Sequence, residues 1–153
     1  MEKIDRRMFM AGAGALIVAA PAIARAQART RITMWKDPNC GCCAGWAARM
    51  EPDFGPVRII PTADMAAFKR ARGVPEDLWS CHTSIIDGWL LEGHVPAEDV
   101  RRLVARGDRQ IRGLAVPGMP LGSPGMEAGG RTQRYQVIAF GPDARRAVYA
   151  THG

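Results

Sequence analysis

Short hydrophobic segments alternate with turns rich in Gly, Pro and Asp along most of the chain. In the first half, apolar and β-branched residues predict strands, and stretches rich in Ala and Arg predict helices. These elements are a strand at 31–36, a helix at 44–50, a strand at 57–60 and a helix at 63–72. Thr62 is the expected N-cap of the second helix and Gly73 its expected end.

The second half contains the strongest hairpin signal of the chain. Asp87-Gly88 stands between two apolar segments, at 83–86 and 89–91. A helix is expected to open at Pro96 and to close at Gly107, with acidic residues in its first turn. The remaining predicted elements are a Gly/Pro-rich loop at 115–130 and two strands at 135–140 and 147–151.

The order of these elements is β-α-β-α-β-β-α-loop-β-β, which indicates an α/β sheet rather than a sandwich of two sheets. A strand followed by a turn with clustered cysteines and then a helix is the opening of a thioredoxin-like unit. The sequence therefore predicts one thioredoxin-like α/β domain over residues 27–153, with a Gly/Pro-rich loop and a C-terminal hairpin.

Residues 1–26 have the pattern of a secretory signal peptide. Arg6-Arg7 precede an apolar run at 11–24, and Ala24-Arg25-Ala26 forms an A-x-A cleavage site. The paired arginines indicate the twin-arginine type of signal. We therefore expect a bacterial periplasmic protein. No second apolar run of membrane length follows, so we expect no membrane span in the mature chain.

Composition narrows the class of function. Hydrophobic residues make up 47% and charged residues 24%, which is ordinary for a globular protein and excludes collagen-like and fully disordered chains. The net charge is +6 without a run of five basic residues, so we expect no nucleic-acid partner. The sequence has no P-loop, dinucleotide-binding or serine-hydrolase motif.

The candidate chemistry lies in four cysteines, which are Cys40, Cys42, Cys43 and Cys81. Three of them stand at a predicted helix N-terminus, where the helix dipole favours thiolates. On a regular helix Cys40 and Cys43 share a face and Cys42 points elsewhere. One tetrahedral ion would then not collect all three, although a loop or several sulfur-bridged ions could. Soft thiolates select Cu(I), Zn(II) or iron–sulfur clusters.

Zinc sites usually use two separated cysteine pairs, which this sequence lacks, so an exported sulfur-rich site favours copper over zinc. Two alternatives stay open. The first is a structural disulfide framework, because the compartment is oxidising. The second is thiol–disulfide exchange through Cys40 and Cys43.

Other soft or nitrogen ligands lie elsewhere in the chain. Met119 and Met126 stand in the Gly/Pro-rich loop, where thioethers could bind Cu(I) or simply fill gaps in the packing. His82 and His94 could ligate a metal, orient a ligand or make structural hydrogen bonds.

Four motifs in order resemble the domain-of-unknown-function family 411, which includes the CopG-type periplasmic copper-binding proteins. They are Asn39-Cys40-Gly41-Cys42-Cys43, Ser80-Cys81-His82-Thr83, Glu92-Gly93-His94-Val95-Pro96 and the segment from Val116 to Glu127. The resemblance covers residues 32–149. It implies a thioredoxin-like fold and a role in copper resistance or homeostasis.

The resemblance also implies a ligand set. It carries over Cys40, Cys42, Cys43 and Cys81 as ligands of a multinuclear copper cluster, with His94, Met119 and Met126 as further candidate ligands. The predicted function is a periplasmic copper-binding protein that holds Cu(I) and buffers copper or changes its oxidation state. The alternatives are a thiol–disulfide oxidoreductase that uses Cys40 and Cys43, and a chaperone that delivers copper to another exported protein.

Overall fold

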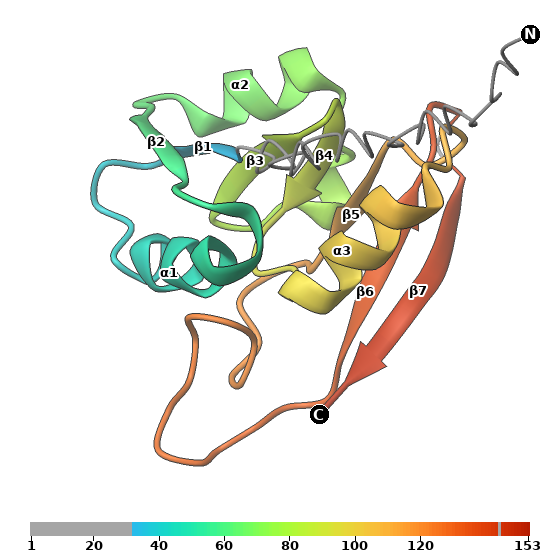
Figure 1. Cartoon of the computed structure of the whole chain (residues 1–153). Helices are drawn as coiled ribbons and strands as arrows, with labels where there is room; N and C mark the ends of the chain where they lie inside the picture. The colour runs from blue at the N-terminus through green and yellow to red at the C-terminus, as the bar shows by residue number, and fades with distance from the viewer. Residues whose placement is uncertain (1–31, 144) are drawn as a thin grey trace, which may run out of the picture.

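A computed structural model describes residues 32–143 and 145–153 of the chain (Figure 1). The predicted signal peptide lies outside the described residues. The helices are α1 (Cys42–Phe54), α2 (Met65–Arg72) and α3 (Ala97–Arg106), with a short 3-10 helix η1 (Glu76–Leu78). The strands are β1 (Thr33–Lys36), β2 (Arg58–Pro61), β3 (His82–Ile86), β4 (Trp89–Glu92), β5 (Gly113–Ala115), β6 (Tyr135–Phe140) and β7 (Arg146–His152).

All seven strands belong to one mixed sheet with the order β2-β1-β3-β4-β5-β6-β7. The pairs β1–β2 and β4–β5 are parallel, and the other neighbours are antiparallel. Parallel neighbours require a crossover connection, and here α1 and α3 provide the two crossovers. The alternation of strands and helices read from the sequence is confirmed as a mixed α/β sheet.

The helices form layers on both faces of the sheet (Figure 1). On one face, Trp46 and Met50 of α1 and Leu103 of α3 pack in a cluster with buried residues such as Met34 of β1. On the other face, Val74 and Leu78, from the segment after α2, pack in a second cluster. The second cluster also contains residues of β4, β5 and β6, which are Leu90, Ala115 and Phe140. Apolar side chains thus cover both faces, as expected for a sheet with helical crossovers.

Some local predictions differ from the structure. α1 is longer than expected at both ends and continues through Pro52. Asp64, rather than Thr62, is the N-cap of α2, because its carboxylate accepts a hydrogen bond from Ala67 N at 2.8 Å. Strand β5 was not predicted, since its three residues carry no alternating pattern and exist as a strand only through pairing with β4 and β6.

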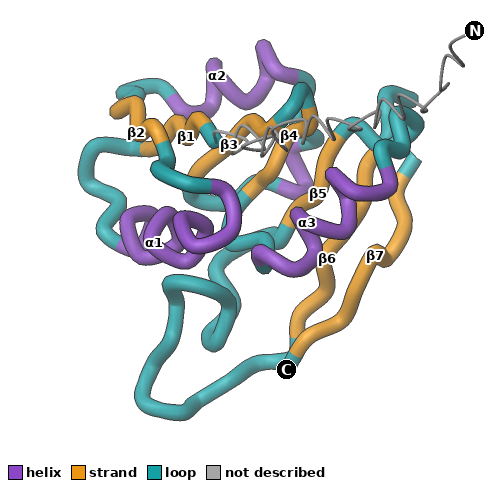
Figure 2. Tube along the Cα trace, viewed as in Figure 1, coloured by secondary structure: helices purple, strands orange, loops and turns teal. Residues whose placement is uncertain are grey.

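The connection from β5 to β6, residues 116–134, is the Gly/Pro-rich loop of the sequence (Figure 2). Its backbone lies directly against the first turns of α1. A Cβ atom on Gly125 would be 2.8 Å from the Gly45 carbonyl carbon and 3.1 Å from Cys42 O. The loop is therefore packed beside the cysteine-bearing end of α1. Within the described residues, no helix is long and apolar enough to cross a membrane.

Candidate metal centre

The structure brings all four cysteines together, as the sequence predicted, between the start of α1 and the start of β3. Their four Sγ atoms lie within 4.8 Å of one another. Cys42 Sγ is 3.5 Å from Cys40 Sγ and 4.0 Å from Cys81 Sγ, and Cys43 Sγ is 3.7 Å from Cys81 Sγ. Cys81 comes from residues nearly forty positions further along the chain, so the cluster is completed by the pairing of β1 with β3.

Of the two arrangements that the sequence left open for Cys40, Cys42 and Cys43, a regular helix and a loop, the structure shows a turn followed by the helix. Only one regular helix through all three residues would turn Cys42 away from the other two. The helix begins only at Cys42, and Cys40 lies in the preceding turn, where Cys40 N donates to Asp37 O at 3.0 Å. The rotation of 100° per residue therefore does not apply between Cys40 and Cys42, and the turn directs both sulfurs to the same place.

Two of the sulfurs are joined in the structure. Cys40 and Cys43 form a disulfide, whereas Cys42 and Cys81 are free thiols. This is the same C-x-x-C pair that the sequence marked for thiol–disulfide exchange. Disulfide sulfurs are not thiolate ligands, so four-thiolate metal binding requires that two electrons first reduce this bond to two thiolates.

The start of α1 favours negative charge. Gly41 is the N-cap and has no side chain to accept from the first backbone N–H groups, and the first turn has no acidic residue. The partial positive charge of the helix end is thus directed at the sulfurs.

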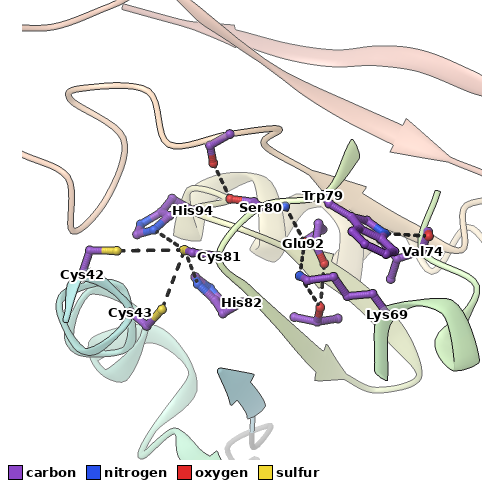
Figure 3. A network of polar contacts seen from close by, with 12 residues as sticks. Cys42, Cys43, Lys69, Val74, Trp79, Ser80, Cys81, His82, Glu92 and His94 are labelled. Carbon is purple, nitrogen blue, oxygen red and sulfur yellow. Dashed lines mark hydrogen bonds and ion pairs between the residues drawn. The ribbon is translucent and has the colours of Figure 1, made fainter. Parts of the chain in front are cut away.

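Two buried histidines contact the fourth sulfur (Figure 3). His94 Nε2 lies 3.0 Å and His82 Nδ1 lies 3.3 Å from Cys81 Sγ. His94 Nδ1 is 2.7 Å from the backbone oxygen of Pro124, in the loop after β5. The structure therefore brings the predicted candidate His94 into the site. His82 also belongs to it, and its position next to Cys81 in the sequence was the signal for this.

Burial determines the electrostatics of this site. Burial and, to a smaller extent, the nearby Cys42 raise the pKa of the Cys81 thiol to about 12. Burial lowers the pKa of both His82 and His94, so both rings are neutral at pH 7. The Cys81 thiol and the two imidazole rings are thus uncharged at pH 7. A metal ion that binds Cys81 must displace the thiol proton.

A buried polar network lies behind Cys81 (Figure 3). Glu92 of β4 accepts hydrogen bonds from Ser80 N at 2.7 Å and from Thr83 Oγ1 at 2.6 Å, and it forms an ion pair with Lys69 of α2. Burial raises the pKa of Glu92, and Lys69 counteracts this effect. Because Ser80 directly precedes Cys81, the network holds the backbone that carries the fourth sulfur. Ser80, Thr83 and Glu92 stand in two of the motifs read from the sequence, but sequence reasoning missed Lys69 and the network itself, because no local pattern links positions 69, 80 and 92.

The two candidate methionines lie in the loop beside the site. Met119 is 53% exposed and Met126 is half-buried. The backbone of Gly118, next to Met119, is hydrogen-bonded to the segment that precedes Cys81. Ser80 Oγ donates to Gly118 O, and Gly118 N donates to Trp79 O at 3.3 Å. Met126 follows Gly125, which lies against α1. Both residues are therefore in a loop that borders the site, and their role as ligands stays a prediction.

Comparisons with known proteins support one family. A family model described as "Protein of unknown function, DUF411" matches residues 78–126. Two solved structures named as forms of copper resistance protein CopG are each 44% identical in sequence. Form 2 aligns over 81% of this chain and 98% of its own with a TM-score of 0.76, and form 1 over 80% and 96% with a TM-score of 0.75. No curated protein sequence matches the chain.

Proposed function

The chain belongs to the DUF411/CopG-like family, and on this premise we propose that it binds copper through Cys40, Cys42, Cys43 and Cys81. The observation that carries this proposal is the gathering of four Sγ atoms within 4.8 Å, on residues of which one is buried and three are half-buried. Soft sulfur ligands favour Cu(I), and the name of the similar solved structures points to the same metal.

Further ligands are proposed beside the four sulfurs. His94 Nε2 is directed at Cys81 Sγ, so a nitrogen ligand for the metal is available at the edge of the cluster. Met119 and Met126 are proposed as thioether donors from the bordering loop. Sulfurs 3.5–4.0 Å apart are close enough to be bridged by metal ions, and we propose a multinuclear Cu(I) site. Zinc is the less favoured metal, because the cysteines form a triplet and a singlet rather than two pairs.

We place this site in a thioredoxin-like domain formed by residues 27–153, exported to the periplasm by a twin-arginine signal peptide at residues 1–26. In that compartment the protein would act in copper resistance or homeostasis. It would hold copper as cargo and exchange it with other periplasmic copper-handling proteins.

A second candidate function is favoured by one observation, the Cys40–Cys43 disulfide. A thiol–disulfide oxidoreductase would use these two sulfurs alone. It would attack a substrate disulfide with one thiolate, and the second thiolate would release the reduced substrate and close the Cys40–Cys43 bond. Cys42 and Cys81 have no required part in that exchange, whereas copper binding needs them.

The test is a copper count on the reduced mature chain. Cu(I) is added anaerobically, unbound metal is removed by desalting, and bound copper is measured by elemental analysis for the wild type and for Cys42→Ser. We expect two or more copper ions per wild-type chain and fewer in the variant. No retained copper, with all four thiols still titratable, would reject the copper function. If the Cys42→Ser variant then keeps the disulfide-exchange activity of the wild type, that result would support the oxidoreductase function.

A further inference from the structure

We infer that His82 is a positioning residue of the cysteine cluster, whose Nδ1–H donates a hydrogen bond to Cys81 Sγ and whose ring does not itself bind the metal. The assignment of the hydrogen bond stands on the geometry of the two histidines. Its consequence for copper rests on the proposed function.

The contacts of His94 determine which of its ring nitrogens carries the proton. Its Nδ1 lies 2.7 Å from the backbone oxygen of Pro124. A carbonyl oxygen can only accept a hydrogen bond, so the Nδ1 of His94 carries a proton. In the neutral ring Nε2 is then the unprotonated nitrogen, and this atom lies 3.0 Å from Cys81 Sγ. His94 therefore faces Cys81 with a lone pair, which accepts the single S–H of the thiol.

The single hydrogen of the Cys81 thiol then determines the role of His82. A thiol has one hydrogen, and His94 takes it, so Nδ1 of His82 at 3.3 Å can bond to the sulfur only as a donor. The assignment holds in the other protonation states as well. If the proton passes to His94, or if a metal replaces it, Cys81 is a thiolate. A lone pair on His82 Nδ1 would repel that thiolate, whereas an N–H is attracted to it.

The opposite edge of the His82 ring favours the same tautomer. His82 is fully buried, and its Nε2 has no hydrogen-bond partner among the described residues. An unpaired buried N–H is rarer in proteins than an unpaired acceptor, so the ring proton belongs on Nδ1. The rings of Trp46 and His94, with centroids 4.6 and 5.1 Å away, hold the imidazole in place.

These contacts separate the roles of the two histidines. The Nδ1 of His82 is occupied by its proton, and its Nε2 faces the core, so His82 has no nitrogen free for the metal. Its N–H instead orients the Cys81 sulfur and withdraws charge from the thiolate. Hydrogen bonds to ligand sulfur are one means by which proteins tune metal affinity and reduction potential.

The tautomer can be measured without copper. In the reduced, copper-free protein labelled with 15N, we expect the NMR shifts of His82 to show a protonated Nδ1 and an unprotonated Nε2. A proton on Nε2 would overturn the inference, whatever metal the protein binds.

The consequence is tested with two variants. His82→Phe keeps an aromatic ring against Trp46 without the donor, and His82→Asn places an amide N–H near the position of Nδ1. We expect His82→Phe to retain the copper count of the wild type but to bind Cu(I) roughly 10- to 100-fold more weakly in competition with a chromophoric chelator. We expect His82→Asn to recover most of the affinity.

The outcomes distinguish the two proposals. A lower copper count in His82→Phe would show that His82 is a ligand. An unchanged affinity for Cu(I) would show that the hydrogen bond does not affect copper binding. Either result overturns the inference. Thermal unfolding of the copper-free variants shows whether a loss of copper affinity comes from misfolding. If it does, the NMR measurement of the His82 tautomer decides the inference. A wild-type protein that binds no copper would instead reject the proposed function and leave the tautomer to the NMR result.

Discussion

Cys81 differs from the other cysteines in its surroundings, because two buried histidines and Cys42 enclose its sulfur. Burial and the nearby Cys42 raise its pKa to about 12. In the protein with the Cys40–Cys43 disulfide, we expect iodoacetamide to modify Cys81 slowly up to about pH 10 and faster as the pH approaches 12. Mass spectrometry of the labelled peptides measures the rate at each pH.

The control is Cys42→Ser, which removes the contribution of Cys42 to the raised pKa. The rise in the labelling rate of Cys81 should then begin at a lower pH. If Cys81 in the wild type reacts at pH 8 as fast as an unhindered thiol in a small peptide, the expectation is wrong.

Gly125 is the second residue on which the site depends. Its φ of +84° is a conformation that L side chains rarely adopt, and a Cβ atom there would press on the backbone of α1. We expect Gly125→Ala to destabilise the protein by about 1–3 kcal/mol from backbone strain alone. Urea unfolding followed by tryptophan fluorescence measures the change.

Gly41→Ala is the matched control, because a Cβ atom on Gly41 meets nothing within 4 Å and its φ of −74° suits any residue. Its free energy of unfolding should stay within about 0.5 kcal/mol of the wild type. Equal effects of the two substitutions would show that the loop does not need its close approach to α1.

At the scale of elements, α2 is joined to the β3–β4 hairpin by the buried ion pair between Lys69 and Glu92. Their side chains are 4% and 0% exposed. Glu92→Gln leaves the charge of Lys69 buried without its partner, which we expect to cost about 3–5 kcal/mol in the free energy of unfolding. Because Glu92 also holds Ser80 N, the same variant should bind copper more weakly.

Glu76→Gln provides the comparison for this pair. It breaks the ion pair between Arg70 and Glu76, whose side chains are 60% and 67% exposed, and it should cost less than about 1 kcal/mol. Chemical denaturation of both variants at pH 7 gives the two values. If Glu92→Gln is no more costly than Glu76→Gln, the buried network does not hold α2 to the hairpin.

Two features set by local chemistry, the Asp87-Gly88 turn and the end of α3, were predicted correctly. Asp87 and Gly88 both have positive φ, of 47° and 87°, as a two-residue turn of this kind requires. Gly107 ends α3 in the left-handed conformation. Strand β5 escaped prediction because its identity comes from its neighbours in the sheet rather than from its own three residues.

At the scale of the whole molecule, the proposed function links copper binding to stability. A ligand that binds only the folded state at 100 times its dissociation constant stabilises that state by about 2.7 kcal/mol, which raises the melting temperature of a domain of this size by roughly 10 °C. We expect this rise when Cu(I) is added to the fully reduced protein. A Cu(I) chelator should reverse it.

The protein that retains the Cys40–Cys43 disulfide is the control for this experiment, because two of its four sulfurs are unavailable to the metal. Its melting temperature should rise much less on addition of Cu(I). Equal rises in the two redox forms, measured by calorimetry under anaerobic conditions, would show that the copper ligands lie elsewhere.

The sequence by itself determined the local chemistry of this protein. The spacing of Cys40, Cys42 and Cys43, the Asp87-Gly88 hairpin and the alternation of strands and helices could all be read directly. These features depend on steric limits and hydrogen bonds among residues a few positions apart, and such short-range effects act in the same way in most folds.

Only the tertiary structure decided which residues surround the sulfurs. The pairing of β1 with β3 brings Cys81 to the start of α1, and the β3–β4 hairpin brings His94 to Cys81. The contact of Glu92 with Lys69 likewise joins β4 to α2. Each of these contacts depends on strand register and on the packing of both faces of the sheet. Such contacts join residues far apart in the chain, so no local sequence pattern predicts them.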